Sequence, residues 1–187
     1  MGKLFNINKT EWENHSLIHN TIDKWLFYAE GYKIASELIE KELIKTLKDR
    51  DSLIYPLMYL NRHYLELKLK EIIVEGNYIL DNKHFMPKGG HDLMTLWIES
   101  QRVLVKVWRG EYDKPSVRIS NKIKEFHKAD LKSDGFRYPV NKEGEDNLIE
   151  FQRIDFKSFI NEFSEVKEYM EEITDGLYYL KDEKDSI

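Results

Sequence analysis

Apolar side chains recur along most of this chain at alternating steps of three and four residues, which is the spacing of one face of an α-helix. The first such pattern covers residues 10–49, and Gly31 inside it indicates a bend or a close helix crossing. The second begins at a cap on Asp51 or Ser52 and ends at Gly76. Three further patterns predict helices from His91 or Asp92 to Gly110, from Pro115 to near Gly135, and from Asp155 past Ile173.

The segment from residue 136 to residue 151 has no helical pattern. It reads FRYPV, then the turn-like NKEGED, then NLIEF, which predicts one short β-hairpin or loop insert. The chain shows no internal repeat and no linker long enough to divide it. The sequence therefore predicts an all-α fold, a helical bundle of five or more helices with this insert, in a single domain over residues 1–187 whose core covers about residues 10–180.

Composition narrows the class of protein. Hydrophobic residues make up 41% of the chain and charged residues 34%, which is typical of a globular domain. The absence of cysteine excludes disulfides, thiolate catalysis and Cys-based zinc sites. No apolar run has the length of a signal peptide or a membrane span, so we expect a cytoplasmic protein without membrane contact. The net charge is −5, yet residues 99–142 hold eleven Lys and Arg against six Asp and Glu.

The second predicted helix is apolar almost all round, which is typical of a helix in the middle of a fold. Two polar strips interrupt it. The strip predicted to be the solvent edge consists of Asn61, Lys68 and Glu71. The other has apolar neighbours on both flanks and consists of Arg62, His63, Glu66 and Lys70. Because buried charges are costly unless they are paired, we expect Glu66 to pair with its neighbours in this second strip.

Other parts of the chain must meet the remaining hydrogen-bonding capacity of this second strip. The expected partners are His91 and Asp92 at the start of the third helix, and Arg137 and Tyr138 in the insert. One interpretation is a structural polar network that fixes the helix register. The other is a pocket that binds phosphate or performs acid–base chemistry. Its candidate catalytic residues are His63, Glu66 and Arg137.

Two consecutive predicted helices carry basic residues on one face. These are Arg102, Lys106 and Arg109 on the third helix, and Lys124, Lys128 and Lys132 on the fourth. Such stripes are usual on solvated faces, and they also suit an RNA backbone. Glu11, His15 and His19 have a spacing that metal ligands can use, but His15 extends the apolar face of the first helix. We therefore expect no metal site and no cofactor.

Three motifs occur in a fixed order: YLNRHYLELKLKEI, then HDLMTLW, then FRYP. Together they resemble the motifs of bacterial HEPN-like proteins, over roughly residues 55–140. The resemblance implies an all-α bundle that commonly dimerises, in toxin–antitoxin, anti-phage or RNA-processing settings. Many HEPN proteins are metal-independent ribonucleases with an Arg, four to six residues, and then a His. This chain departs from that pattern, because eight residues separate Arg118 from His127, and Arg62 directly precedes His63.

Two functional hypotheses follow. The first is a HEPN-like effector that binds RNA or a nucleotide, including a ribonuclease-type toxin or an anti-phage defence protein. The second is a non-catalytic helical interaction module whose buried polar network is purely structural. In both cases the resemblance implies a homodimer, and a protein partner such as an antitoxin is compatible with either. The missing Arg-to-His spacing favours the module, and the basic middle of the chain favours the effector.

Overall fold

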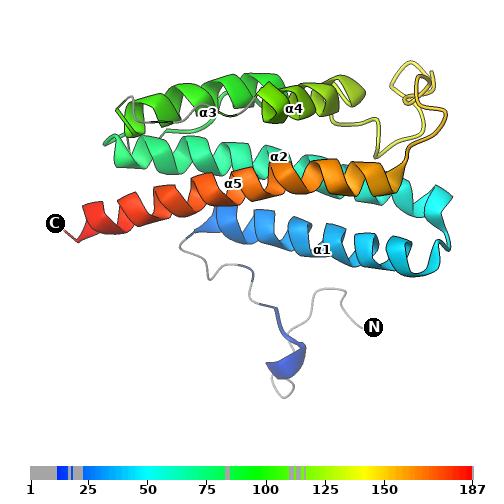
Figure 1. The fold of residues 1–187 in the computed structure, drawn as a ribbon, viewed down its shortest axis with the longest axis horizontal. Coiled ribbons are helices and arrows are strands. Elements are labelled where there is room, and N and C mark those ends of the chain that lie inside the picture. Colours follow the sequence, from blue (N-terminus) through cyan, green and yellow to red (C-terminus); the bar gives the residue numbers. More distant parts are fainter. Residues whose placement is uncertain are drawn as a thin grey trace, which may run out of the picture.

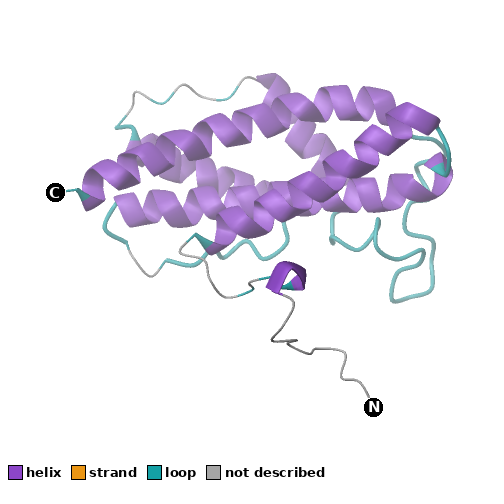
Figure 2. Ribbon diagram, turned by 90° about the horizontal axis from the view of Figure 1, so that it is seen from below, coloured by secondary structure: helices purple, strands orange, loops and turns teal. Residues whose placement is uncertain are grey.

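The computed structural model describes residues 12–16, 18, 23–82, 85–109, 112, 115 and 117–186. In these residues the chain forms a 3₁₀ turn and five α-helices (Figure 1). They are η1 (Trp12–Asn14), α1 (Lys24–Thr46), α2 (Arg50–Ile79), α3 (Leu93–Val107), α4 (Val117–Ala129) and α5 (Phe156–Asp185). The described part of the chain contains no strand (Figure 2). The predicted all-α fold is therefore confirmed.

The helix α2 lies in the middle of the bundle. Its neighbours are α1, α3 and α5, and α4 packs in turn on α3 and α5. Figure 1 shows α3 and α4 along one side of α2 and α5, with α1 along the other side. Because α2 is enclosed in this way, Tyr64, Leu65 and Ile73 are completely buried although they point in different directions around its axis. This is the central helix that the apolar pattern predicts.

The helix α3 runs parallel to α2, although the two follow each other in the chain. His91, just before the start of α3, lies beside Arg62 of α2. Val103, near the end of α3, packs on Gly76 of α2. The segment between the helices must therefore return along the length of α2. A Cβ atom on Gly76 would lie 2.3 Å from Cγ1 of Val103, so glycine allows this close approach. The helix continues through Gly76 to Ile79, and the predicted end at Gly76 is wrong.

Two helix starts differ from the prediction, and two agree with it. The helix α1 begins at Lys24 rather than near residue 10, and α2 begins at Arg50, ahead of the predicted caps at Asp51 or Ser52. The start of α3 is as predicted, because the side chain of Asp92 accepts a hydrogen bond from the backbone N–H of Thr95. Asp155 caps α5 in the same way.

Aromatic packing fixes α4 and the insert against α5. The ring of Phe126 meets those of Phe136, Phe159 and Phe163 edge to face, with centroids 5.4 to 6.4 Å apart. The insert itself is a series of turns with one antiparallel bridge, between Val140 and Asp146. It is therefore a loop insert rather than a two-stranded hairpin. In the described residues no helix is long and apolar enough to span a membrane.

Candidate functional site

The guanidinium group of Arg62 joins three helices. This side chain is completely buried, and its Nη1 donates to Oε2 of Glu66 over 3.1 Å. Its Nη2 donates to the backbone carbonyl of His91 over 2.8 Å, and its Nε donates to the backbone carbonyl of Asp130 over 3.3 Å. Oδ2 of Asp130 also lies 3.3 Å from Nε. The rigid fork of five N–H donors explains why arginine suits this position better than lysine.

Glu66 is the acidic centre of this group, with 1% of its surface exposed. Its Oε1 accepts a hydrogen bond from Nζ of Lys70 over 2.7 Å and lies 2.8 Å from Nδ1 of His91. Burial raises the pKa of the Glu66 carboxyl, but the hydrogen bonds and charges of Lys70 and His91 outweigh that effect. The pKa therefore lies below its ordinary value. We call Arg62, Glu66, Lys70, His91 and Asp130 the α2–α3–α4 network.

His91 is the part of this network that faces solvent. Its side chain is 68% exposed, although it touches the buried carboxylate of Glu66. With Glu66 ionised, Nδ1 carries the proton of a neutral imidazole and Nε2 has a free lone pair. A buried carboxylate that orients an exposed imidazole is an arrangement suited to general acid–base chemistry. The sequence indicated His91 only as a network partner.

His63 lies in a different environment from His91. Its ring meets Tyr32 edge to face, with centroids 4.4 Å apart, and stacks on Tyr59 at 5.8 Å. Partial burial lowers the pKa of His63, the charges of Lys70 and Arg62 lower it further, and Glu66 opposes the shift. The ring is thus neutral at pH 7 and held by aromatic packing. This geometry favours His91 over His63 as the acid–base residue.

Arg137 lies near this group but does not contact Glu66. It is exposed, its Nε donates to the carbonyl of Ser133 over 2.6 Å, and its guanidinium lies 5.8 Å from the ring centroid of Tyr59 and 5.4 Å from that of Tyr138. The prediction that the insert supplies partners to the buried strip is therefore wrong for Arg137 and Tyr138. It is also wrong for Asp92, whose side chain caps α3.

Asp130 is the partner that sequence reasoning missed. Besides its contacts with Arg62, its Oδ1 accepts hydrogen bonds from the backbone N–H groups of Asp134 and Gly135, both over 3.0 Å. An Asp just after a helix is a usual turn residue, but nothing local marks Asp130 as a partner of α2. The buried network thereby holds the turn that leads into the insert.

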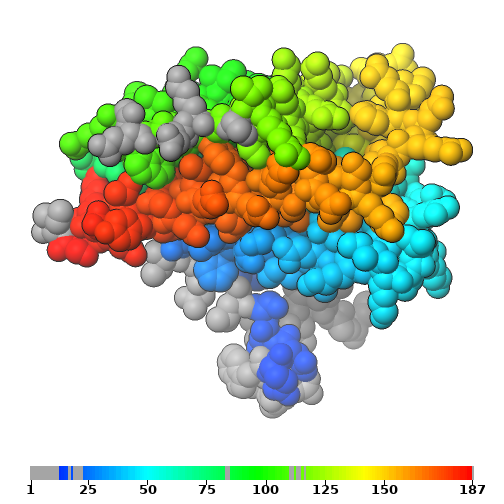
Figure 3. Space-filling view, in the orientation of Figure 1, coloured from blue at the N-terminus to red at the C-terminus, as the bar shows by residue number. Residues whose placement is uncertain are grey.

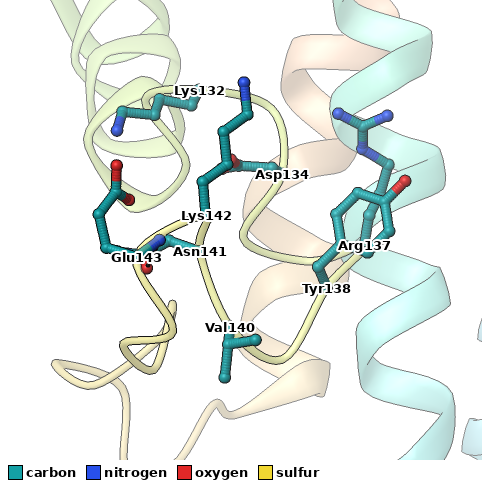
Figure 4. Close-up of a pocket in the computed structure, with 8 residues that line it drawn as sticks. All are labelled: Lys132, Asp134, Arg137, Tyr138, Val140, Asn141, Lys142 and Glu143. Atoms are coloured by element: carbon teal, nitrogen blue, oxygen red, sulfur yellow. Dashed lines mark hydrogen bonds between the residues drawn. The ribbon is translucent and has the colours of Figure 1, made fainter.

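A cavity of about 650 Å³ opens beside this turn (Figure 4). Its lining carries the positive charges of Lys132, Arg137 and Lys142 and the negative charges of Asp134 and Glu143. The other lining residues are Tyr138, Val140 and Asn141. The surplus of cations and the exposed Tyr138 ring make this cavity suitable for a phosphorylated ligand with an aromatic base.

The basic residues of α4 divide into two sets. On one face, Arg118 and Lys122 form ion pairs with the α5 residues Glu162 and Glu165. On another face, Lys124 and Lys128 are exposed, and no ion pair to either is found in the described part of the chain. Lys132 was predicted on the same helix but lies in the turn after α4, where it is also exposed and lines the cavity. The predicted α4 stripe therefore leads into the cavity.

The predicted α3 stripe lies elsewhere along the bundle. Arg102, Lys106 and Arg109 are all exposed. Arg102 and Lys106 belong to the half of α3 that packs near Gly76, whereas Arg109 lies in the turn after the helix and not on it as predicted. The α4 stripe ends near Arg62. Gly76 and Arg62 are 14 positions apart in α2, which corresponds to about 21 Å along the helix axis. The two stripes therefore occupy separate stretches of the same layer of the bundle.

The first polar strip of α2 is not a solvent edge. Asn61, Lys68 and Glu71 are all completely or almost completely buried, because α5 covers this side of α2, and Figure 3 shows α5 crossing the bundle between α1 and the α3–α4 layer. Nζ of Lys68 donates to Oγ1 of Thr174 over 2.7 Å and lies 3.3 Å from Oε2 of Glu71. We call Tyr64, Lys68, Glu71, Glu171, Thr174 and Tyr178 the α2–α5 network.

The metal hypothesis concerned a part of the chain that is mostly outside the described residues. Glu11 and His19 fall outside them, and His15 is described. In the part of the chain that the structure describes, no group of three potential metal ligands lies together. No residue set there can be assigned to a metal.

Comparisons with protein-family models, with curated proteins and with solved structures find no match to this chain. The resemblance to HEPN-like proteins therefore rests on the three motifs alone. The fold brings those motifs together. Arg62 of the first contacts the backbone of His91 in the second, and Arg137 of the third lies over the Tyr59 ring of the first.

Proposed function

We propose that this protein is a HEPN-like effector that binds single-stranded RNA along α4 and in the cavity of the insert. The observation that supports the proposal is the α4 stripe. Lys124 and Lys128 are exposed without an acidic partner among the described residues, and they lead to Lys132 and Arg137 in the cavity. The toxin or anti-phage setting is an implication of the motif resemblance and belongs to the proposal.

The chemistry of the stripe and the cavity suits RNA. Lys124 and Lys128 stand about 6 Å apart along the helix axis, and exposed lysines gain affinity for a phosphate backbone through counterion release. Tyr138 is 56% exposed beside the Arg137 guanidinium. An aromatic ring next to a cation is a usual stacking platform for an unpaired base. The backbone would lie on the lysines, with a base against Tyr138.

Binding of a labelled single-stranded RNA by purified protein across a salt series tests the proposal. The logarithm of the association constant should fall linearly with the logarithm of salt concentration. The double variant Lys124→Ala/Lys128→Ala should bind more weakly and reduce that slope by about 1.4, because each lost phosphate contact removes about 0.7. Lys48→Ala/Lys157→Ala is the matched control, since both lysines are exposed and lie off the stripe.

The control variant should retain the slope and affinity of the unaltered protein. If the control variant loses as much affinity as the stripe variant, the loss comes from the change in net charge and not from the position of the lysines. Absence of binding at low salt would contradict the proposal, and would leave the non-catalytic interaction module with a purely structural network as the better hypothesis.

RNA cleavage is a second candidate function, favoured by the contact between Glu66 and His91. In such a reaction Nε2 of His91 would take the proton of a ribose 2′-hydroxyl. The 2′-oxygen would bond to the adjacent phosphorus as the bond from phosphorus to the 5′-oxygen breaks, and that oxygen would take a proton from solvent. The products would be a 2′,3′-cyclic phosphate end and a 5′-hydroxyl end.

The change His91→Gln separates cleavage from binding. It should lower the cleavage rate by about 10²- to 10⁴-fold, the usual contribution of a general base, and leave RNA affinity unchanged. His63→Gln is the control, and it should retain cleavage because His63 packs between tyrosines. Loss of activity in the His63 variant alone would contradict this assignment, and loss on chelation would indicate a metal site instead.

A further inference from the structure

The outer face of α1 carries an apolar stripe that faces solvent. Phe27, Ile34 and Leu38 are 60%, 49% and 62% exposed. With Gly31 between them they follow steps of four, three and four residues, so all four lie on one side of the helix. We call Phe27, Gly31, Ile34 and Leu38 the α1 stripe. Contiguous exposed apolar side chains of this kind mark interaction sites.

Gly31 distinguishes this stripe from an ordinary exposed face. Glycine destabilises a helix interior relative to alanine, and the other two helical glycines have a reason inside the fold. A Cβ atom on Gly76 would collide with Val103, and one on Gly176 would lie 3.2 Å from the Trp108 ring. At Gly31, leaving aside the backbone of α1 itself and the two chain neighbours, no atom of the described residues lies within 4 Å of the position of a Cβ. The open surface there allows the backbone of a second helix to come close.

We infer that the α1 stripe is the interface between two copies of this chain, with their α1 helices antiparallel. In the register that the stripe favours, paired residue numbers sum to 65. Phe27 then meets Leu38 of the second copy, and Gly31 meets Ile34 of the second copy. Each large side chain of the stripe thus faces another apolar residue or the space above a glycine. A stripe that is complementary to itself is what a two-fold interface requires.

The flanking charges support this antiparallel arrangement. Lys24 and Glu42 are 18 positions apart, which is five full helical turns, so they lie on the same flank of α1. Both are exposed. In the antiparallel register Lys24 lies within one residue of the level of Glu42 of the second copy, on the flank that faces it, and the two-fold axis repeats the pair. In a parallel arrangement the flank that carries Lys24 and Glu42 would not face the same flank of the second copy, so these two charges would not pair.

The exposed area predicts the strength of the contact. Large apolar side chains bury roughly 150–250 Å² each when fully covered. The three large side chains of the stripe and Tyr28, which is 57% exposed beside it, are each about half exposed. They offer roughly 400 Å² per copy, or roughly 800 Å² in total, at the low end of specific interfaces. The dimer should therefore be reversible, with a dissociation constant in the micromolar range or weaker.

Sedimentation equilibrium over a series of protein concentrations tests this inference. The average mass of the unaltered protein should rise from 22.5 kDa towards twice that value. Leu38→Glu should remain a monomer at every concentration and keep its helical circular dichroism, because the changed side chain is exposed. Tyr179→Glu is the matched control, since Tyr179 is 63% exposed on α5. It should dimerise like the unaltered protein.

A charge exchange tests the register and the identity of the partner. Lys24→Glu and Glu42→Lys should each weaken the dimer at least several-fold, because each creates two like-charged contacts across the two-fold axis. The double variant Lys24→Glu/Glu42→Lys should restore it. A protein that stays monomeric at all concentrations would overturn the inference, as would a Leu38→Glu variant that dimerises normally.

Discussion

The two buried polar networks of α2 differ in the balance of their charges. In the α2–α3–α4 network, Arg62 and Lys70 accompany Glu66 and Asp130, and the pKa of Glu66 is lowered. In the α2–α5 network Lys68 lies between two carboxylates, those of Glu71 and Glu171. Burial raises the pKa of Glu71, and the charge of Lys68 only partly opposes it. The first network therefore stabilises the ionised form of Glu66, whereas burial in the second favours the protonated form of Glu71.

The networks also differ in their access to solvent. The α2–α3–α4 network ends in the exposed ring of His91, beside the turn that leads to the cavity. Lys68, Glu71 and Thr174 of the α2–α5 network are almost completely buried between two helices. The α2–α5 network reaches solvent through the carboxylate of Glu171, whose side chain is 31% exposed. The α2–α3–α4 network instead presents an imidazole, which can take part in acid–base chemistry. Substitutions in the two networks should therefore have different consequences.

The largest expected effect is that of Arg62→Met. It leaves Glu66 and Asp130 buried without their shared cation, which should lower the free energy of unfolding at pH 7 by about 3–5 kcal/mol. Lys68→Met is the matched change in the other network. It should cost only about 1–3 kcal/mol, because Glu71 can take up a proton. Urea unfolding measures the free energy of unfolding of both variants. An equal loss in the two variants would show that the two networks do not differ in this respect.

A smaller effect, with a pH signature, is expected for the two glutamates. Because the folded pKa of Glu66 is lowered, its contribution to stability is present at neutral pH and is lost as pH falls below the unfolded pKa of about 4.5. Glu66→Gln should thus cost on the order of 3 kcal/mol at pH 7, and less as the pH falls through that range. Unfolding free energies at neutral and acidic pH measure this change.

Glu71 should show the opposite sign. Its raised folded pKa means that its contribution is present in acid and lost as pH rises through that value. Although Lys68 Nζ is 3.3 Å away, Oε2 of Glu71 accepts no hydrogen bond within the described residues. Glu71→Gln should therefore cost about 1 kcal/mol or less at pH 7. A Glu71 variant that loses as much as the Glu66 variant would show that both carboxylates are equally stabilised.

The smallest effect concerns His63 at the edge of the first network. Its folded pKa lies below the unfolded value of about 6.5. Its contribution to stability is thus present above that pH and lost as the pH falls through the folded pKa. His63→Gln should flatten the fall of stability between about pH 7 and pH 5 by less than about 1 kcal/mol, since the ring is partly exposed. An unchanged pH profile would show that His63 does not titrate on unfolding.

The pattern of apolar positions was enough to predict the helices, the central place of α2 and the caps at Asp92 and Asp155. These depend on local spacing and on side chains that bond to nearby backbone groups. The pattern did not predict that Lys68 and Glu71 are buried. Their covering partners, Thr174 and Tyr178, are more than 100 positions further along the chain. A polar strip along a predicted helix is therefore compatible both with a solvent-exposed face and with a buried polar network.

The composition of the buried strip around Glu66 could be predicted in part. Arg62 and Lys70 are one helical turn from Glu66, and the spacing alone places them together. The contact with Asp130 depends on how α4 packs, 68 positions away. The choice of His91 over His63 depends on exposure and on neighbouring tyrosines. Neither can be read from the order of residues along one helix.

The contacts of Arg62 also set an order in which the helices can dock during folding. Its bond to His91 closes a segment of 29 residues, and its bond to Asp130 closes one of 68. The longer closure costs about 0.8 kcal/mol more chain entropy, so we expect α3 to dock before α4. A contact made after the rate-limiting step affects mainly the unfolding rate. Asp130→Asn should therefore shorten the lifetime of the native state and leave the refolding rate almost unchanged in stopped-flow experiments.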